Sequence, residues 1–403
     1  MTHGDERPCP VCGASAGEVL HHRAFVLPDG HPLSSGYDVV TCLICGAAYA
    51  TPLPDQAAYD RFYRDDSKYA DAATGTGSGA QAWDDERLEE TAHALASFAP
   101  EKSTHIVDVG CGAGGLLRWF AKLGYTNLTG IDPATACATA TSAITGVRGL
   151  VGSLFALPAE LEHADLIVLS HVLEHVRDVG IAIDGLKAIT APGGKVYCEV
   201  PNASQYTEYL VAPFLDFNTE HINHFSVGTL KRLFAARGWK IVASGSKAIA
   251  SSPTTRYPCA WVLAELPKAG ESVPAVPADR ALRAALTRYV AASQELLERV
   301  VARLSATCIT STEIIVWGTG QTTAILLAET PLGSARIKAF TDSNAKNFGR
   351  TIAGAPVVPP DALRAMPETP IVIGSLLHGA EIAASISARG LPNPVIRLDP
   401  GAQ

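Results

Sequence analysis

The chain has 403 residues, too many for a single hydrophobic core, so we expect two or three domains. Its hydrophobic content of 47% and charged content of 18% are those of an ordinary globular protein, and its net charge of −8 argues against a nucleic-acid partner. A run of about 18 apolar residues, as a membrane span needs, is missing, and the first residues do not resemble a signal peptide. We therefore expect a cytoplasmic protein without a membrane partner, whose nine cysteines are reduced.

Two pairs of cysteines come first in the chain. Cys9 and Cys12 form one pair and Cys42 and Cys45 the other, and in each pair two residues separate the cysteines and a glycine follows. One such pair can chelate a single ion, and the glycine lets the following amides turn toward the sulfurs. Four sulfur ligands favour a tetrahedral Zn²⁺ ion in a closed, structural site. We predict that residues 1–60 form a zinc-binding module whose metal takes no part in catalysis.

The stretch after this module is aromatic and acidic, and within it Tyr69 is the polar aromatic side chain that we expect nearest a substrate. Residues 72–80 are rich in Gly, Thr and Ala and form either a mobile lid over a site or a loose linker. Residues 83–98 then predict a helix that leads into the next domain.

A strand that ends in glycines follows this helix. Residues 106–109 are apolar apart from Asp108, as in a central parallel strand, and Gly110, Gly112 and Gly114 allow a sharp turn and a close ligand. Asp132 stands 22 residues beyond Gly110, at the expected end of the second strand, where an acid can accept hydrogen bonds from a ribose diol. The pattern favours a site for a nucleoside-type cofactor over a merely tight turn.

The spacing G-x-G-x-G after an acid resembles the first motif of the class I S-adenosylmethionine-dependent methyltransferases, and residues 152–158, 164–175 and 192–201 resemble their later strands and loops. This resemblance implies a doubly wound α/β sheet over residues 61–250. It also implies that S-adenosylmethionine binds to a set of residues from these motifs: Asp108, Gly110, Gly112, Gly114, Asp132, Ser153, Leu154 and Ser170. Ser153 stands where the family often has an Asp that contacts adenine, so we expect backbone groups and Leu154 to recognise the adenine.

A second group of polar residues lies between 216 and 226. Glu220, His221 and His224 precede Ser226, which predicts the N-cap of a helix over residues 230–237. Histidine titrates near neutrality and is a natural general base. The alternative is a capped turn whose histidines bind only local backbone groups.

Glu220 and His221, followed after three residues by Phe225 and Ser226, resemble the E-H-x-x-x-F-S signature of the bacterial sugar C-methyltransferases. The resemblance implies methylation of a carbon next to the keto group of a nucleotide-linked deoxysugar, with dTDP as the expected nucleotide, in antibiotic deoxysugar biosynthesis. His221 would be the base and Glu220 its partner, while His175 and Tyr69 match further active-site residues of the family. Two departures concern the substrate more than the reaction. Asn218 stands where the family commonly has a Tyr. Residues 173–175, Leu-Glu-His, stand where the family has a Phe-Ala-His-like pattern.

The remaining chain predicts a connection and a third unit. Prolines accumulate from Ser251 to Pro277 and predict an irregular connection, after which residues 279–306 predict one long amphipathic helix; residues 251–310 therefore form a linker and helix. We expect this helix to pack between two α/β domains, and a place at a dimer interface is the less favoured alternative.

Residues 311–403 predict a smaller Rossmann-like domain, with Asp342 following its glycine turn. Because Thr323 replaces the third glycine, a degenerate fold that frames the nucleotide end of the substrate is favoured over dinucleotide binding.

Two other functions compete with this reading. The first is an O- or N-methyltransferase of a small secondary metabolite, with the histidine-rich loop as base for a hydroxyl. The second is a non-catalytic scaffold that only senses the cofactor, against which the intact glycines, Asp132 and the Glu220–His221 pair argue. We expect a monomer or a weak homodimer.

Overall fold

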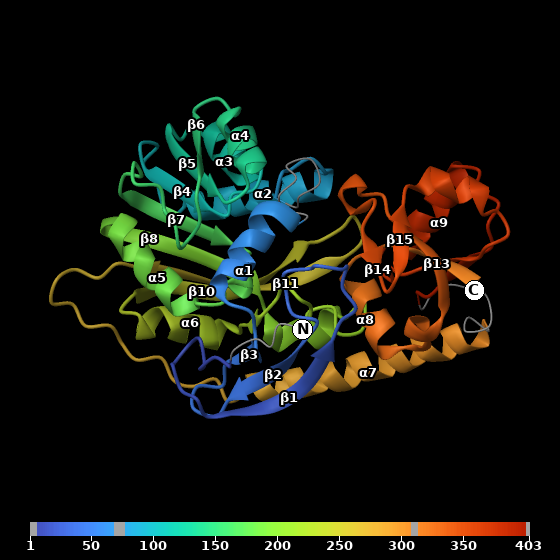
Figure 1. Cartoon of the computed structure of the whole chain (residues 1–403). Coiled ribbons are helices and arrows are strands. Elements are labelled where there is room, and N and C mark those ends of the chain that lie inside the picture. Colours follow the sequence, from blue (N-terminus) through green and yellow to red (C-terminus); the bar gives the residue numbers. More distant parts are fainter. Residues whose placement is uncertain (1–5, 68–76, 308–312, 400–403) are drawn as a thin grey trace.

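The computed structural model describes residues 6–67, 77–307 and 313–399, which form three sheets (Figure 1). In Figure 1 the N-terminal sheet (blue) lies below a larger sheet (green and teal), and the C-terminal unit (orange to red) lies to the right. Helix α7 (Leu282–Ala306) runs along the lower side and reaches from the N-terminal sheet to the C-terminal unit. None of the described helices has the length and apolar character needed to cross a membrane.

The N-terminal sheet is antiparallel and has the order β1-β2-β3-β9. Its strands are β1 (Gly17–Ala24), β2 (Gly36–Cys42), β3 (Ala48–Thr51) and β9 (Asn223–His224). Strand β9 comes from a distant part of the sequence and pairs Asn223 with Tyr49 and His224 with Ala48. The segment predicted to be catalytic thus completes the sheet of the cysteine-containing module. Helix α1 (Gln56–Arg61) and the short helix η1 (Phe62–Asp66) lead away from this sheet.

The second sheet has seven strands in the order β10-β11-β8-β7-β4-β5-β6. Every strand is parallel to the others except β11, which is antiparallel to both neighbours. The strands are β4 (His105–Val109), β5 (Asn127–Asp132), β6 (Val147–Val151), β7 (Ala164–Ser170), β8 (Thr190–Pro201), β10 (Lys240–Ala250) and β11 (Arg256–Glu265). The connecting helices include α2 (Ala82–Ala96), α3 (Gly115–Lys122), α4 (Thr135–Ser142), α5 (Val179–Leu186) and α6 (Val227–Ala236).

The central strand of this sheet is β4, and all five of its residues are buried, as its apolar sequence predicts. The chain moves outward from β4 to β5 and β6, then returns to β7 on the other side of β4. Ligands of open α/β sheets bind where the strand order reverses in this way, at the carboxyl ends of the strands. The class I methyltransferase sheet expected from the sequence is confirmed.

The predicted irregular connection from Ser251 to Pro277 is wrong in its first part. Strand β11 lies inside the sheet between β10 and β8, so the sheet extends beyond the predicted boundary at residue 250. Pro258 is tolerated because its register partner is Ala248 of β10 alone, while pairing with β8 begins one residue later, at Cys259. The irregular stretch begins only after β11.

The C-terminal unit contains a six-stranded sheet in the order β14-β15-β13-β12-β16-β17, parallel except for β14. Its strands are β12 (Glu313–Trp317), β13 (Arg336–Thr341), β14 (Thr351–Ile352), β15 (Ala355–Val358), β16 (Ile371–Ile373) and β17 (Val395–Arg397), with helices α8 (Gln321–Glu329) and α9 (Gly379–Ala388). Helix α7 packs between the domains, against η5 (Ala203–Tyr209) on one side and η6 (Pro331–Ser334) on the other. One hydrophobic core therefore continues from the N-terminal sheet through α7 into the C-terminal sheet.

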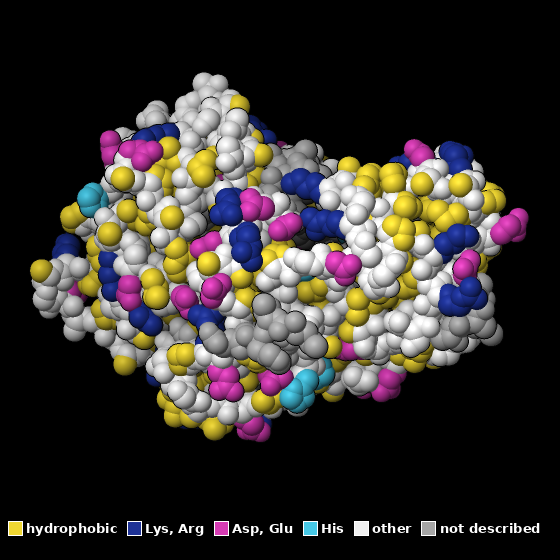
Figure 2. All heavy atoms as spheres, in the orientation of Figure 1, with side chains coloured by type: hydrophobic (Ala, Val, Ile, Leu, Met, Phe, Trp, Pro, Cys, Tyr) yellow, Lys and Arg dark blue, Asp and Glu magenta, His cyan; other side chains and the backbone are white. Residues whose placement is uncertain are grey.

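The face of the molecule seen in Figure 2 carries basic and acidic side chains interspersed with one another. No large patch of one sign is visible on this face, in agreement with the modest net charge.

Candidate active site

A cavity of about 660 Å³ opens at the carboxyl ends of β4 and β7, within the size range of small-molecule sites. All three units contribute to its wall. Gln56 and Tyr63 come from the segment after the N-terminal sheet, Asp108 and Ser170 from the seven-stranded sheet, and Gln321 from the C-terminal unit. A ligand that fills this cavity would contact residues from all three units.

The glycine turn after β4 forms one end of the cavity. Gly110, Gly112 and Gly114 all have positive φ angles, of 80°, 53° and 76°, a region that side chains other than glycine rarely adopt. Gly110 and Gly112 line the cavity, whereas a Cβ on Gly114 would meet Thr141 at 2.9 Å. Gly114 therefore allows α3 to pack closely on α4, and Gly110 likewise allows the Val172 side chain to approach the turn, because a Cβ on Gly110 would meet it at 2.7 Å.

Asp132 fixes this turn from the end of β5. Its Oδ2 accepts a hydrogen bond from the amide of Gly112 and its Oδ1 one from the amide of Ala134, both at 2.9 Å. Burial raises the pKa of Asp132 to about 6. Burial and the neighbouring Asp132 raise the pKa of Asp108 to about 7. Two crowded carboxyl groups at one end of the cavity favour a ligand that carries positive charge.

The other residues predicted to hold the cofactor also line the cavity: Ser153, Leu154 and Ser170. The Oγ of Ser153 accepts a hydrogen bond from the amide of Phe155 at 3.2 Å, so its own proton remains available for another acceptor. Leu154 is largely buried and offers an apolar surface. Their individual roles toward a ligand remain predictions.

His175 and His221 also line the cavity, with ring centroids 5.0 Å apart. Nδ1 of His175 is 3.0 Å from the carbonyl oxygen of Glu220 and 2.8 Å from the hydroxyl of Tyr63. Because a carbonyl only accepts hydrogen bonds, Nδ1 of His175 is the donor to Glu220. These contacts fix the orientation of the His175 ring.

The loop that carries Glu220 and His221 is held by side chains on both sides. Oδ1 of Asn218 accepts the amides of Glu220 at 2.8 Å and of His221 at 2.9 Å, which gives a structural role to the residue that departs from the family pattern. Oε1 of Glu220 accepts a hydrogen bond of 3.0 Å from the side-chain amide of Gln321 in the C-terminal unit. Its Oε2 is buried and has no hydrogen-bond partner among the described residues. A carboxylate oxygen in this state favours a ligand that donates to it.

His224 does not belong to the cavity. It lies fully buried in β9, with its ring packed against Phe217 at a centroid distance of 4.7 Å. Burial lowers the pKa of its imidazole to about 3, so His224 is neutral. Tyr69 lies outside the described residues, and among those described Tyr63 is the tyrosine that contacts His175.

The four cysteines of the N-terminal module meet at one point. The Sγ atoms of Cys9 and Cys45 are 3.5 Å apart, those of Cys12 and Cys42 are 3.6 Å apart, and all four lie within 4.8 Å of one another. The glycine after the second pair, Gly46, has a φ of 82°. The donor set and its spacing fit a tetrahedral thiolate-bound zinc ion.

Arg7 joins this cluster to the loop of Glu220 and His221. Its buried guanidinium donates to the carbonyl oxygens of Ala50 and Ile222 at 2.9 Å and 2.7 Å, and to the side chain of Asn223 at 2.9 Å. Arg7 thus bonds to both sides of the β3–β9 pair. The segment that carries the cysteine cluster and the loop of Glu220 and His221 are parts of one hydrogen-bonded structure.

Residues 81–244 match the family model described as a methyltransferase domain. The chain carries a methyltransferase domain. The match begins in α2 and ends in β10, so it contains the glycine turn, Asp132, His175 and the Glu220–His221 pair. S-adenosylmethionine as the methyl donor is the cofactor that this match supports.

Among curated proteins, the chain is 26% identical over 275 residues to the C-methyltransferase NovU of Streptomyces niveus, across 62% of this chain and 60% of that protein. It is 35% identical over 113 residues to the ubiquinone biosynthesis O-methyltransferase of Colwellia psychrerythraea, across 27% of this chain and 45% of that protein. The chain thus spans only about half the length of these relatives. The solved 1,6-didemethyltoxoflavin-N1-methyltransferase of Burkholderia thailandensis is 16% identical, with a TM-score of 0.41, over 56% of this chain and 98% of that one, too distant to add to the argument.

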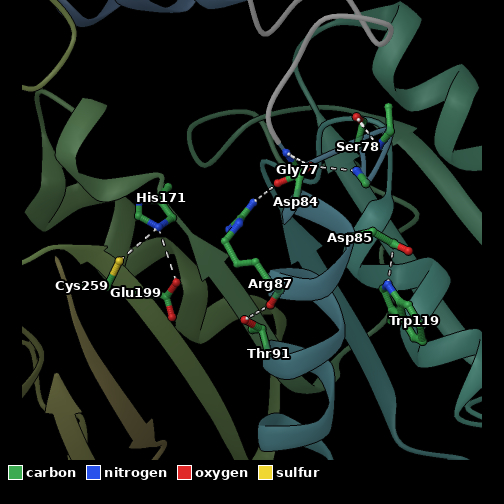
Figure 3. A network of polar contacts seen from close by, with 12 residues as sticks. Gly77, Ser78, Asp84, Asp85, Arg87, Thr91, Trp119, His171, Glu199 and Cys259 are labelled. Carbon is green, nitrogen blue, oxygen red and sulfur yellow. Dashed lines mark hydrogen bonds and ion pairs between the residues drawn. The ribbon is translucent and has the colours of Figure 1, made fainter. Parts of the chain in front are cut away.

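The methyltransferase domain also contains polar residues near the cavity that the sequence did not indicate (Figure 3). Arg87 of α2 is buried, lines the cavity and donates to Oδ1 of Asp84 at 2.7 Å. Oδ2 of Asp84 accepts the amides of Gly77 and Gly79 at 2.9 Å and 2.8 Å. The described end of the glycine-rich stretch is therefore tied to α2, while residues 72–76 lie outside the described residues.

Proposed function

We propose that the protein transfers the methyl group of S-adenosylmethionine to a carbon next to the keto group of a nucleotide-linked deoxysugar. The observation that carries this proposal is the shared cavity. Both the glycine turn with its two acids and the loop of Glu220 and His221 line it. A cofactor and a second substrate can thus meet within one cavity.

When bound, S-adenosylmethionine would supply an electrophilic methyl group on a positively charged sulfur. Asp132 would accept hydrogen bonds from the ribose, and Asp108 would add negative charge near the cation. His221 would take the proton from the carbon next to the ketone, so that the electrons of the broken C–H bond form an enolate. The Tyr63 hydroxyl would donate to the enolate oxygen, and a general base such as His221 contributes roughly 10²–10⁴-fold to the rate.

The C-methyltransferase relative supports carbon as the acceptor, because its similarity extends over more of this chain than the O-methyltransferase similarity does. The Glu-His-x-x-x-Phe-Ser resemblance supports the keto sugar. Gln321 and Leu377 line the cavity from the C-terminal unit, which supports a role for that unit at the nucleotide end of the substrate. We further propose that Cys9, Cys12, Cys42 and Cys45 hold a structural zinc ion.

A hydroxyl acceptor is the second candidate, and the O-methyltransferase relatives favour it. In that case His221 would deprotonate an oxygen instead of a carbon. The fold and the residues proposed to bind the cofactor would be suited to either reaction.

The test uses the purified full chain, methyl-labelled S-adenosylmethionine and a panel of nucleotide-linked 4-keto sugars. We expect label to appear on carbon, as located by NMR, and we expect the acidic C–H to exchange with D₂O without cofactor. Label on oxygen or nitrogen would replace the proposal with the second candidate. Tight NAD(H) binding without affinity for S-adenosylmethionine would refute both.

A further inference from the structure

His171 follows β7 directly and has an unusual backbone. Its φ is 57°, in the left-handed region, and its amide donates to the carbonyl oxygen of Glu199 at 2.8 Å. Residues other than glycine that are held in this region gather at functional sites. The His171 side chain lines the cavity, four residues before His175.

Both ring nitrogens of His171 face carboxylates. Nδ1 is 3.2 Å from Oε1 of Glu174, and Nε2 is 3.4 Å from Oε1 of Glu199 and 3.6 Å from Sγ of Cys259 (Figure 3). Glu199 is fully buried and also receives the ammonium of Lys247 at 2.6 Å and the hydroxyl of Tyr197 at 2.5 Å, so it is ionised. Carboxylates only accept hydrogen bonds, so a carboxylate beside each ring nitrogen favours the doubly protonated imidazolium form of His171.

The electrostatic surroundings agree with this charge. Burial alone would lower the pKa of His171, but its contacts with Cys259, Glu174 and Glu199 hold it well above the ordinary value. Burial alone would raise the pKa of Glu199, but His171 and Lys247 hold it well below the ordinary value. Burial raises the pKa of Cys259, so Cys259 remains a thiol and the two carboxylates supply the negative charge.

These contacts form a chain of alternating charge: Lys247, Glu199, His171 and Glu174. The chain ends at the active-site histidine, because the same Oε1 of Glu174 that faces His171 lies 3.9 Å from Nε2 of His175. Glu174 is 1% exposed, so solvent screens neither contact. One carboxylate oxygen is therefore shared between a charged histidine and the proposed active-site histidine.

We propose that His171 is a positioning residue whose imidazolium pairs with Glu174 and so withholds that carboxylate from Nε2 of His175. The consequence for methyl transfer rests on the function proposed above, whereas the pairing itself does not. Without the His171 cation, the contact of Glu174 with Nε2 of His175 would remain, and an adjacent opposite charge favours a protonated imidazole. Among the described residues, the groups that contact His175 include the Tyr63 hydroxyl, the Glu220 carbonyl and His221.

The first experiment is ¹⁵N NMR of the full chain with labelled histidine, with His175→Asn used to assign the His175 signals. We expect both nitrogens of His171 to stay protonated at neutral pH. In His171→Asn, whose new residue tolerates a positive φ, the titration midpoint of His175 should move upward by about one pH unit or more. His378→Asn is the matched control, because His378 also faces a glutamate three residues later, Glu381 at 3.0 Å, but does not itself line the cavity. It should leave His175 unchanged.

Three outcomes would overturn the proposal. They are a neutral His171 in the wild-type spectrum, an unchanged His175 midpoint in a folded His171→Asn, and a second metal ion per chain that Cys259→Ser removes. The wild-type spectrum decides the point even if His171→Asn does not fold. If methyl transfer is found, the acid limb of its pH–rate profile should shift upward in His171→Asn. If no acceptor is ever methylated, the proposed function fails while the NMR result still stands.

Discussion

Replacement of Asp132 by Asn tests the cofactor end of the cavity with a nearly isosteric change. Each oxygen of Asp132 accepts one backbone amide at 2.9 Å, from Gly112 and from Ala134. An asparagine can accept only one of them, and its NH₂ group faces the other N–H. We expect the free energy of unfolding to fall by about 1–3 kcal/mol, the cost of one unsatisfied buried donor.

The effect on cofactor affinity should come in addition to this loss of stability. A hydrogen bond between a carboxylate and a ribose hydroxyl contributes roughly 1.5–3 kcal/mol, so Kd for S-adenosylmethionine should rise roughly 10- to 150-fold. Calorimetry at about pH 8 measures this, because burial leaves Asp132 with a pKa of about 6 and thus ionised there.

The C-terminal sheet supplies a matched control. Asp342 accepts the amides of Thr319 and Asn344, also at 2.9 Å each, after an equivalent glycine turn. Asp342→Asn should therefore destabilise the fold by a similar amount and leave cofactor affinity unchanged. If Asp132→Asn binds S-adenosylmethionine as tightly as the wild type does, or if both variants lose affinity equally, the assignment of the cofactor site is refuted.

Three further outcomes are expected. Elemental analysis should find one zinc ion per chain, which Cys42→Ser loses and the control Cys137→Ser keeps. A normal zinc content in Cys42→Ser would refute the proposed metal site. Cofactor binding should weaken from about pH 8 to about pH 5, because burial leaves Asp108 and Asp132 with pKa values of about 7 and 6 and both then lose their charge; calorimetry in two buffers should detect proton release. His221→Asn should slow methyl transfer about 10²–10⁴-fold without changing cofactor affinity, and a full rate would place the base elsewhere.

Local patterns predicted the parts of the site that a short segment builds by itself. Gly110 and Gly112 need positive φ and the cysteine pairs need a tight turn, and both requirements are visible within a few residues. The long helix before the C-terminal unit is also present as predicted, because its apolar spacing is regular.

The parts that the sequence missed depend on contacts between distant segments. Gln321 reaches Glu220 only because the C-terminal unit packs beside the loop, and nothing around Gln321 marks it. His171 acquires its charge from Glu199 and Lys247, which lie on other strands. Strand β11 escaped notice because Pro258 and the prolines on either side of the strand suggested a loop, and only the pairing register explains why Pro258 is tolerated.

The pairing of β3 with β9 would link the proposed metal site to the loop of Glu220 and His221. An ion bound by the cysteines would stabilise the N-terminal sheet, and β9 and Arg7 would pass part of that free energy to the loop of Glu220 and His221. Loss of the ion would then disorder the loop while the cofactor end, held by its own sheet, stays folded. A metal-depleted enzyme of this design would still bind its methyl donor but not use it, so cofactor binding alone would overstate the active fraction of a preparation.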